Sequence, residues 1–251
     1  MSDETYQLDR RGASEHATQR SGYAVDSFTT SKARLRLWQL ISPALPIGAY
    51  AYSRGLEYAV SAGWVANETD AAAWIEGQLT HVFVSLDVPV FARLYRAWQG
   101  GDEGALAYWN SFLLASRESA ELLAEDHYLG TALARLLSDL GIEAARAWQV
   151  AERPGFATLF ALGAERWDIE LTEAAQAYAW VWSEHQVAAA VKLIPLGQTA
   201  GQRMLSRLAD VIPEAVHSGL TLGDDAIGGV AQGVGIASAL HEGQYTRLFR
   251  S

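Results

Sequence analysis

The chain has 251 residues, half of them hydrophobic, and carries a formal net charge of −10 with no cysteine. A chain of this size can bury one sizeable core, and its acidic charge argues against nucleic acid and anionic membrane surfaces as partners. The absence of cysteine excludes disulfides, iron–sulfur clusters and thiolate zinc sites.

The N-terminal residues 1–31 are polar and lack periodicity, so we expect a disordered arm without a signal peptide. The folded domain is predicted over residues 32–251. It begins with a helix in which Leu35, Trp38 and either Ile41 or Leu40 mark the apolar face, and Pro43 lies just beyond the end of this helix.

Helical periodicity continues along the rest of the chain, whereas the alternation typical of strands is absent and β-branched residues are scarce. We therefore predict an all-α fold, with about eight to ten helices in a single domain. Asn67 and Thr172 are the expected N-caps of two of these helices. The predicted helices after the first lie at about 49–62, 68–87, 89–98, 103–139 (two helices), 157–167, 173–194 and 198–212, and the tail begins as a helix.

The most apolar segment, residues 174–194, contains Glu184, His185 and Lys192. A membrane span rarely carries such side chains, so we predict a central buried helix and no membrane association. Lys192 is expected either to extend its head to the surface or to meet a carboxylate. Together with the missing signal peptide and cysteines, these features favour a cytoplasmic protein.

The sequence offers no positive case for an enzyme. Neither Lys32 nor Lys192 follows a glycine, so a phosphate-binding loop is missing. The histidines form no His-Glu-x-x-His motif, and we predict no cofactor and no metal ligand. His241 and Glu242 form an adjacent pair that could take up a divalent ion at the surface, although a solvated histidine is the favoured interpretation.

The segment SPALPIGAYAYSRGLE, residues 42–57, indicates a rigid loop followed at once by a helix. If Tyr50 begins that helix, then Tyr50, Ser53, Arg54 and Glu57 share one face and form a charged, hydroxyl-rich strip. Spacing alone supports two interpretations equally. One is a solvated face with a weak ion pair, and the other is an interface of the kind that uses tyrosine and arginine.

A second set of polar residues lies on and after the apolar helix. His185 and Lys192 stack at helical spacing with small alanines between them, and Gln198, Gln202 and Arg203 follow on the next helix. Glycines between these residues permit close helix packing. The set is therefore explained either by packing or by a polar surface for a partner.

A third set lies in the tail. Tyr245, Leu248 and Phe249 are apolar at helical spacing, and Arg247 and Arg250 lie beside them. The end of a chain is usually frayed unless something holds it. An apolar, arginine-bearing tail therefore indicates that a partner binds and orders it.

Three blocks of the sequence resemble the UreF family of urease accessory proteins. They are residues 40–65, residues 187–205 and the C-terminal IASALHEGQYTRLFRS, residues 236–251, with a looser match at 116–133. The blocks follow the family's order and span nearly all the chain after residue 32. The resemblance implies an all-helical protein that tends to form homodimers and is not known to catalyse a reaction.

The resemblance also implies partners and a function. Family members bind the accessory protein UreD (also called UreH) and the GTPase UreG, and the complex helps apo-urease to acquire its nickel ions and its lysine carbamate. We therefore predict a non-catalytic scaffold for urease maturation. The alternative is a nickel metallochaperone with its own metal site. A GTP hydrolase is a third possibility, against which the missing phosphate loop argues.

Partner-binding residues are predicted on two sides of the protein, and no catalytic residue is predicted. The GTPase side comprises Tyr50, Ser53, Arg54, Glu57, Lys192, Gln198 and Arg203. The UreD/UreH side comprises His241, Glu242, Tyr245, Leu248, Phe249 and Arg250.

Overall fold

The computed structural model describes residues 31–149 and 154–250, and the regular structure within these ranges is helical, with no strand. The prediction of an all-α fold is confirmed. The arm predicted over residues 1–31 lies outside the described residues, except for Ser31, which is helical.

After a helix at residues 31–40, the chain forms α-helices joined by short connections, two short 3-10 helices (η1 and η3) and one π-helix (η2). The elements are η1 (Ala49–Ala51), α2 (Leu56–Ser61), α3 (Glu68–Gln78), η2 (Leu79–Asp87), α4 (Val88–Gly100), α5 (Glu103–Ala115), α6 (Ala120–Asp139), α7 (Ala144–Gln149), α8 (Phe156–Arg166), α9 (Leu171–Leu193), α10 (Gln198–Leu220), η3 (Asp224–Ala226) and α11 (Gln232–His241).

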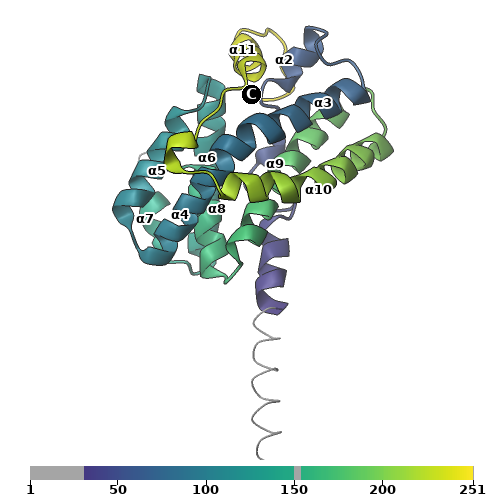
Figure 1. The fold of residues 1–251 in the computed structure, drawn as a ribbon. Helices are drawn as coiled ribbons and strands as arrows, with labels where there is room; N and C mark the ends of the chain where they lie inside the picture. The colour runs from purple at the N-terminus through teal and green to yellow at the C-terminus, as the bar shows by residue number, and fades with distance from the viewer. Residues whose placement is uncertain (1–30, 150–153, 251) are drawn as a thin grey trace, which may run out of the picture.

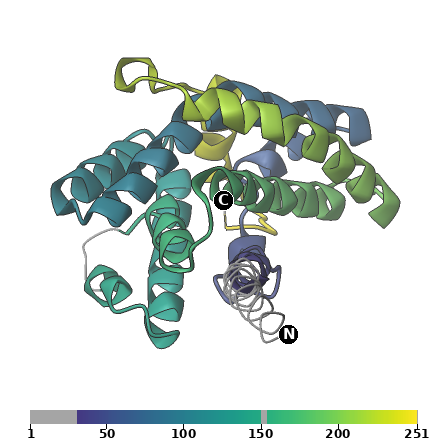
Figure 2. The same cartoon turned by 60° about the horizontal axis from the view of Figure 1, so that its bottom comes forward.

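Helix α9 runs through the middle of the molecule and packs against α2, α3, α4, α8 and α10 (Figure 1). Figure 2 shows α3 and α10 side by side on one side of α9. The predicted central helix is confirmed, because most of its alanines are buried and let its neighbours approach closely. Among the described helices, α9 included, none has the length and apolarity that a membrane span requires.

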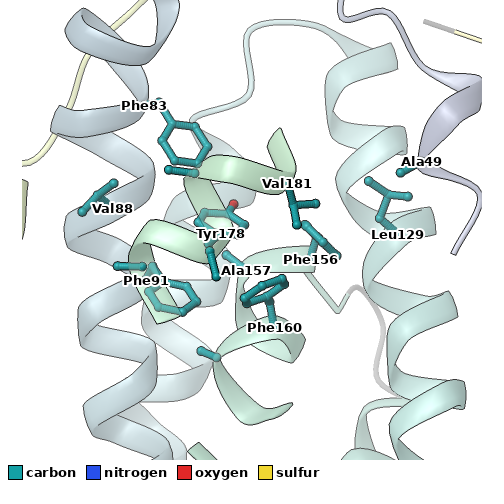
Figure 3. Packing of buried hydrophobic residues seen from close by; sticks show 14 of the residues in the cluster. Ala49, Phe83, Val88, Phe91, Leu129, Phe156, Ala157, Phe160, Tyr178 and Val181 are labelled. Atoms are coloured by element: carbon teal, nitrogen blue, oxygen red, sulfur yellow. The ribbon is translucent and has the colours of Figure 1, made fainter. Parts of the chain in front are cut away.

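Aromatic rings form the middle of the core around Tyr178 of α9 (Figure 3). Its ring stacks on Phe91 with 5.1 Å between centroids, and Phe83, Phe156 and Phe160 lie within 5.9 Å of it. Such offset and edge-on pairs add to the stabilisation that burial already supplies. The core therefore joins α9 to η2, α4 and α8.

The helix predicted at 68–87 is divided, because the π-helix η2 follows α3 and leads directly into α4. Helix α10 crosses η2 very closely: a Cβ on Gly219 would lie 2.6 Å from the carbonyl oxygen of Val84. Long π-helical stretches are rare and are held by their surroundings. Here the wider turn directs Asp87, the last residue of η2, into the protein interior.

The helix predicted at 49–62 is wrong in its first half. After one turn of 3-10 helix the chain straightens, Arg54 and Gly55 take left-handed backbone angles (φ 53° and 79°), and α2 begins only at Leu56. A Cβ on Gly55 would lie 2.8 Å from the backbone nitrogen of Ser238. Contact with α11 therefore sets the shape of this loop, which local spacing does not reveal.

The first helix, residues 31–40, projects from the body in both views (Figures 1 and 2). The predicted apolar face is wrong for Leu35 and Trp38, which are each 57 % exposed, and right for Leu40, which is buried together with Leu37. The body of the protein covers only the face that carries the latter two side chains.

The capping predictions are half right. The side chain of Asn67 accepts a hydrogen bond from the backbone nitrogen of Asp70 and so caps α3, as predicted. Thr172 lies inside α9 instead. The carboxylate of Glu170 is the cap, accepting from the amides of Thr172 and Glu173.

Candidate functional site

The residues predicted on the GTPase side do not form one exposed strip. Tyr50 is 70 % exposed, but Ser53 is completely buried and Glu57 is 7 % exposed. The strip fails because the chain between Tyr50 and Leu56 is not a helix, so the four side chains point in different directions. Arg54 also leaves the surface and pairs with Glu125 in the interior.

Lys192 lies at the C-terminal end of α9 with its head exposed, which is the first of the two outcomes expected for it. Its ammonium lies 5.7 Å from the ring centroid of Tyr50 and 5.5 Å from that of Phe249. Cation–π contacts at this distance are worth about 0.5–1 kcal/mol when exposed. Lys192 therefore joins the loop after the first helix to the C-terminal tail.

A hollow of about 250 Å³ opens between α9 and α10 beside Lys192. Gly201 of α10 packs tightly there, since its Cβ would lie 2.9 Å from Val191, whereas Gly197 has open space around it. We call this site the α9–α10 hollow. It is lined by Glu184, Val187, Ala188, Val191, Lys192, Gln198, Gly201, Gln202 and Leu205.

A second, more apolar hollow of about 150 Å³ lies beside the first, because Glu184 and Ala188 line both. Burial raises the pKa of Glu184 and lowers the pKa of His185 to about 4. His185 is therefore neutral at neutral pH. Arg203, by contrast, is exposed outside the hollow and donates to Glu68 of α3 at 2.8 Å.

Sequence reasoning missed a set of buried charges that we call the interior ion cluster: Arg54, Asp87, Arg117, Glu125 and Asp126. Arg117 donates to Asp87 and to Asp126, both at 2.8 Å, and Arg54 lies 3.3 Å from Glu125. Burial alone would lower the pKa of Arg117, but the two aspartates raise it well above its usual range. Burial raises the pKa of Glu125.

The interior ion cluster holds helix ends together. Asp126 of α6 accepts a 2.6 Å hydrogen bond from the backbone nitrogen of Phe156, the first residue of α8, and Tyr178 donates to Asp87 at 3.3 Å. The available signal in the sequence was Asp87, a charged residue in an apolar stretch. A buried carboxylate needs a cationic partner. The partner, Arg117, lies 30 residues away.

The tail is not helical beyond α11 and is bound by its own chain. The amides of Leu248 and Phe249 donate to the carboxylate of Glu57 at 2.6 and 2.8 Å, and the amide of Arg250 donates to Ala51. The ring of Phe249 is 6 % exposed. The expectation that a partner orders this residue is therefore wrong, because Glu57 and the protein body already hold it.

His241 is not the solvated surface histidine that the sequence favoured. Its ring is completely buried between Glu57 and Glu121, and Arg247 pairs with Glu121. Both ring nitrogens are engaged, so the suggested surface ion site with Glu242 is wrong as well. Among the described residues, no three histidine, aspartate or glutamate side chains are placed to hold a metal ion together.

Four large apolar side chains remain exposed on α11 and on the segment directly after it. Leu240 is 45 % exposed, and Ile236, Tyr245 and Leu248 are more exposed still. We call these four residues the α11 face. Of the residues predicted on the UreD/UreH side, Glu242, Tyr245, Leu248 and Arg250 are exposed, whereas His241 and Phe249 are buried.

Comparisons with known proteins agree with the sequence blocks described above. A family model described as UreF matches residues 65–209. The chain is 54 % identical over 219 residues to the urease accessory protein UreF of Alkalilimnicola ehrlichii, covering 87 % of this chain and 96 % of the relative. It is 46 % identical over 222 residues to the protein of the same name from Psychrobacter cryohalolentis, covering 87 % of this chain and 94 % of the relative. It is also 46 % identical over 215 residues to that from Chromohalobacter salexigens, covering 86 % of this chain and 93 % of the relative. The chain belongs to the UreF family of urease accessory proteins.

Proposed function

We propose that this chain serves urease maturation as a non-catalytic scaffold that links a UreD/UreH-type protein and the GTPase UreG to apo-urease. Membership in the UreF family supports the process, and the exposed surfaces described above support a binding role. The proposal includes a homodimer, as the family resemblance implies, and a cytoplasmic location, as the sequence features favour.

The observation that carries this proposal is the α11 face. Large exposed apolar side chains on one helix and the segment directly after it are typical of protein interfaces, because burying them on association is favourable. We assign the UreD/UreH-type partner to this face, with Glu242 and Arg250 as exposed charges beside it. Phe249 and His241 support the face from inside rather than by direct contact.

We assign the GTPase to the α9–α10 hollow. Lys192, Gln198 and Gln202 supply polar groups around a concave apolar floor, and Tyr50 is exposed beside Lys192. Tyrosine and cationic side chains at the edge of a pocket are frequent anchors in interfaces. Ser53, Arg54 and Glu57 are too deeply buried to contact this partner directly.

Affinity capture from cells that produce urease and its accessory proteins tests both assignments. Leu240→Arg changes the α11 face, Ala188→Trp fills the α9–α10 hollow, and Tyr108→Ala on α5 is a matched control at another exposed position. We expect Ala188→Trp to lose UreG but to keep the UreD/UreH-type protein, and Leu240→Arg to lose the latter. Wild-type recovery of both partners by both variants would overturn the proposal.

A further inference from the structure

The ring of His241, the last residue of α11, lies between two carboxylates. Its Nδ1 lies 2.8 Å from Oε2 of Glu121, and its Nε2 lies 3.1 Å from Oε2 of Glu57. The side chain has no exposed surface. The ring nitrogens therefore have these two carboxylates as partners in place of solvent water.

Both carboxylates also accept hydrogen bonds from other donors. Glu57 accepts from the amides of Leu248 and Phe249, and Glu121 accepts from Arg247 at 2.9 Å. Donors of this kind favour the ionised form of a carboxylate. An ionised carboxylate can only accept, so each ring nitrogen of His241 must donate.

A neutral imidazole carries one N–H, whereas an imidazolium carries two. With a neutral ring, one nitrogen lone pair would face a buried carboxylate, which is repulsive and leaves that carboxylate short of a donor. We propose that His241 is held as the imidazolium and that its second proton controls the binding of the C-terminal tail to the protein body.

The charges around the ring come from three elements: Glu57 from α2, Glu121 from α6, and Arg247 from the tail. With His241 charged, two cations balance two anions. Loss of the second proton leaves a buried excess of negative charge, which is costly unless a carboxylate moves. If Glu57 moves, the amides of Leu248 and Phe249 lose their acceptor.

Release of the tail would withdraw the ring of Phe249 from Lys192, whose ammonium lies 5.5 Å from the ring centroid. The consequence for partners rests on the proposed function: release of the tail displaces Leu248, one of the four residues of the α11 face that we assign to the UreD/UreH-type protein. The second proton of His241 would then regulate the same surface that we assign to that partner.

The first experiment observes the ring directly in the full chain. Nuclear magnetic resonance with 15N-labelled histidine, assigned through His241→Gln, should show protons on both ring nitrogens at neutral pH. A ring with a single protonated nitrogen there would overturn the proposal.

The second experiment follows hydrogen exchange of the amides of Leu248 and Phe249, corrected for intrinsic rates, while pH rises until the ring loses its second proton. We expect their protection to fall at least tenfold at that transition while amides of α9 keep theirs. Unchanged tail protection, or simultaneous loss in α9, would refute the proposal.

Glu121→Gln is a matched variant, and its result does not require the His241→Gln variant to fold. An amide can accept from the ring or donate to it, so this variant should keep the tail bound but lose the pH dependence of its protection. A pH dependence equal to that of the wild type would count against the proposal. These measurements use the isolated chain, so a negative result leaves the partner assignments intact. Conversely, a negative result in the affinity capture leaves the proposed role of His241 intact.

Discussion

The ammonium of Lys192, at the end of α9, lies 5.5 Å from the ring centroid of Phe249 in the tail. The two residues were predicted to serve different partners on different sides of the protein. Their contact places the α9–α10 hollow next to the tail, which carries Tyr245 and Leu248 of the α11 face. The two proposed binding surfaces are therefore neighbours.

Lys192→Ala is expected to leave the thermal midpoint almost unchanged, because the ammonium is exposed and makes only weak contacts. It should weaken binding of the GTPase UreG by roughly 1–2 kcal/mol, about tenfold, as for a moderate hot spot. Lys32→Ala, at the only other lysine, is the matched control. Measurement of the thermal midpoint and of UreG binding side by side checks both expectations. A lower thermal midpoint with normal UreG binding would contradict them.

Phe249→Ala and Leu248→Ala separate the two roles of the tail. Phe249 is buried, so its loss should cost roughly 2–3 kcal/mol, less than for a central phenylalanine because it lies on a peripheral segment. Leu248 is exposed, and its loss should cost less than about 0.5 kcal/mol. Urea unfolding measures both values, and equal costs would show that Phe249 is not packed as described.

Arg117→Met should be strongly destabilising. It leaves Asp87 and Asp126 buried without their cation, and removing one partner of a buried ion pair costs roughly 3–5 kcal/mol. Arg203→Met is the control, because its pair with Glu68 is exposed and should change stability little. Chemical unfolding of both variants compares them, and similar small losses would contradict a structural role for the interior ion cluster.

His185 predicts an acid-dependent loss of stability. Burial lowers its pKa from 6.5 to about 4, so the unfolded chain binds this proton at a higher pH than the folded chain does. Stability is therefore lost as pH falls from about 6.5 toward 4, by up to roughly 1.4 kcal/mol per pH unit within that window. His185→Gln should lose less stability over the same range of pH.

The isolated protein is expected to lack a tight, stoichiometric nickel site. The described residues offer no convergent set of ligands, and both nitrogens of His241 face carboxylates on opposite sides of the ring. Equilibrium dialysis against nickel measures this directly. A saturable one-to-one isotherm would instead support the metallochaperone alternative.

Much of the fold could be predicted because its signals are local. Apolar periodicity indicated most helices, and Asn67, four residues after Gly63, indicated the start of α3. The π-helix escaped prediction. Gly219 of α10, far away in the sequence, lies in close contact with Val84 of this helix. Local patterns reveal helices, but not the geometry that distant neighbours impose on them.

The site was predicted less well, for the same reason. Ser53 lies in a loop and Glu57 in the first turn of α2, and sequence reasoning placed both on one polar helix face. They are buried because α11 and the tail cover them, and the only local sign of this approach is Gly55. Lys192 was predicted correctly, since the cost of burying a lysine in an apolar helix does not depend on distant segments.

The hydrogen bond from Leu248 to Glu57 spans 191 residues of sequence. During synthesis at 5–20 residues per second, Glu57 is made about 10–40 s before the amides that bind it. Until then, its carboxylate and the neighbouring loop must remain in water, because no donor is present to accompany them inside. This part of the protein can therefore close only after the tail has been synthesised.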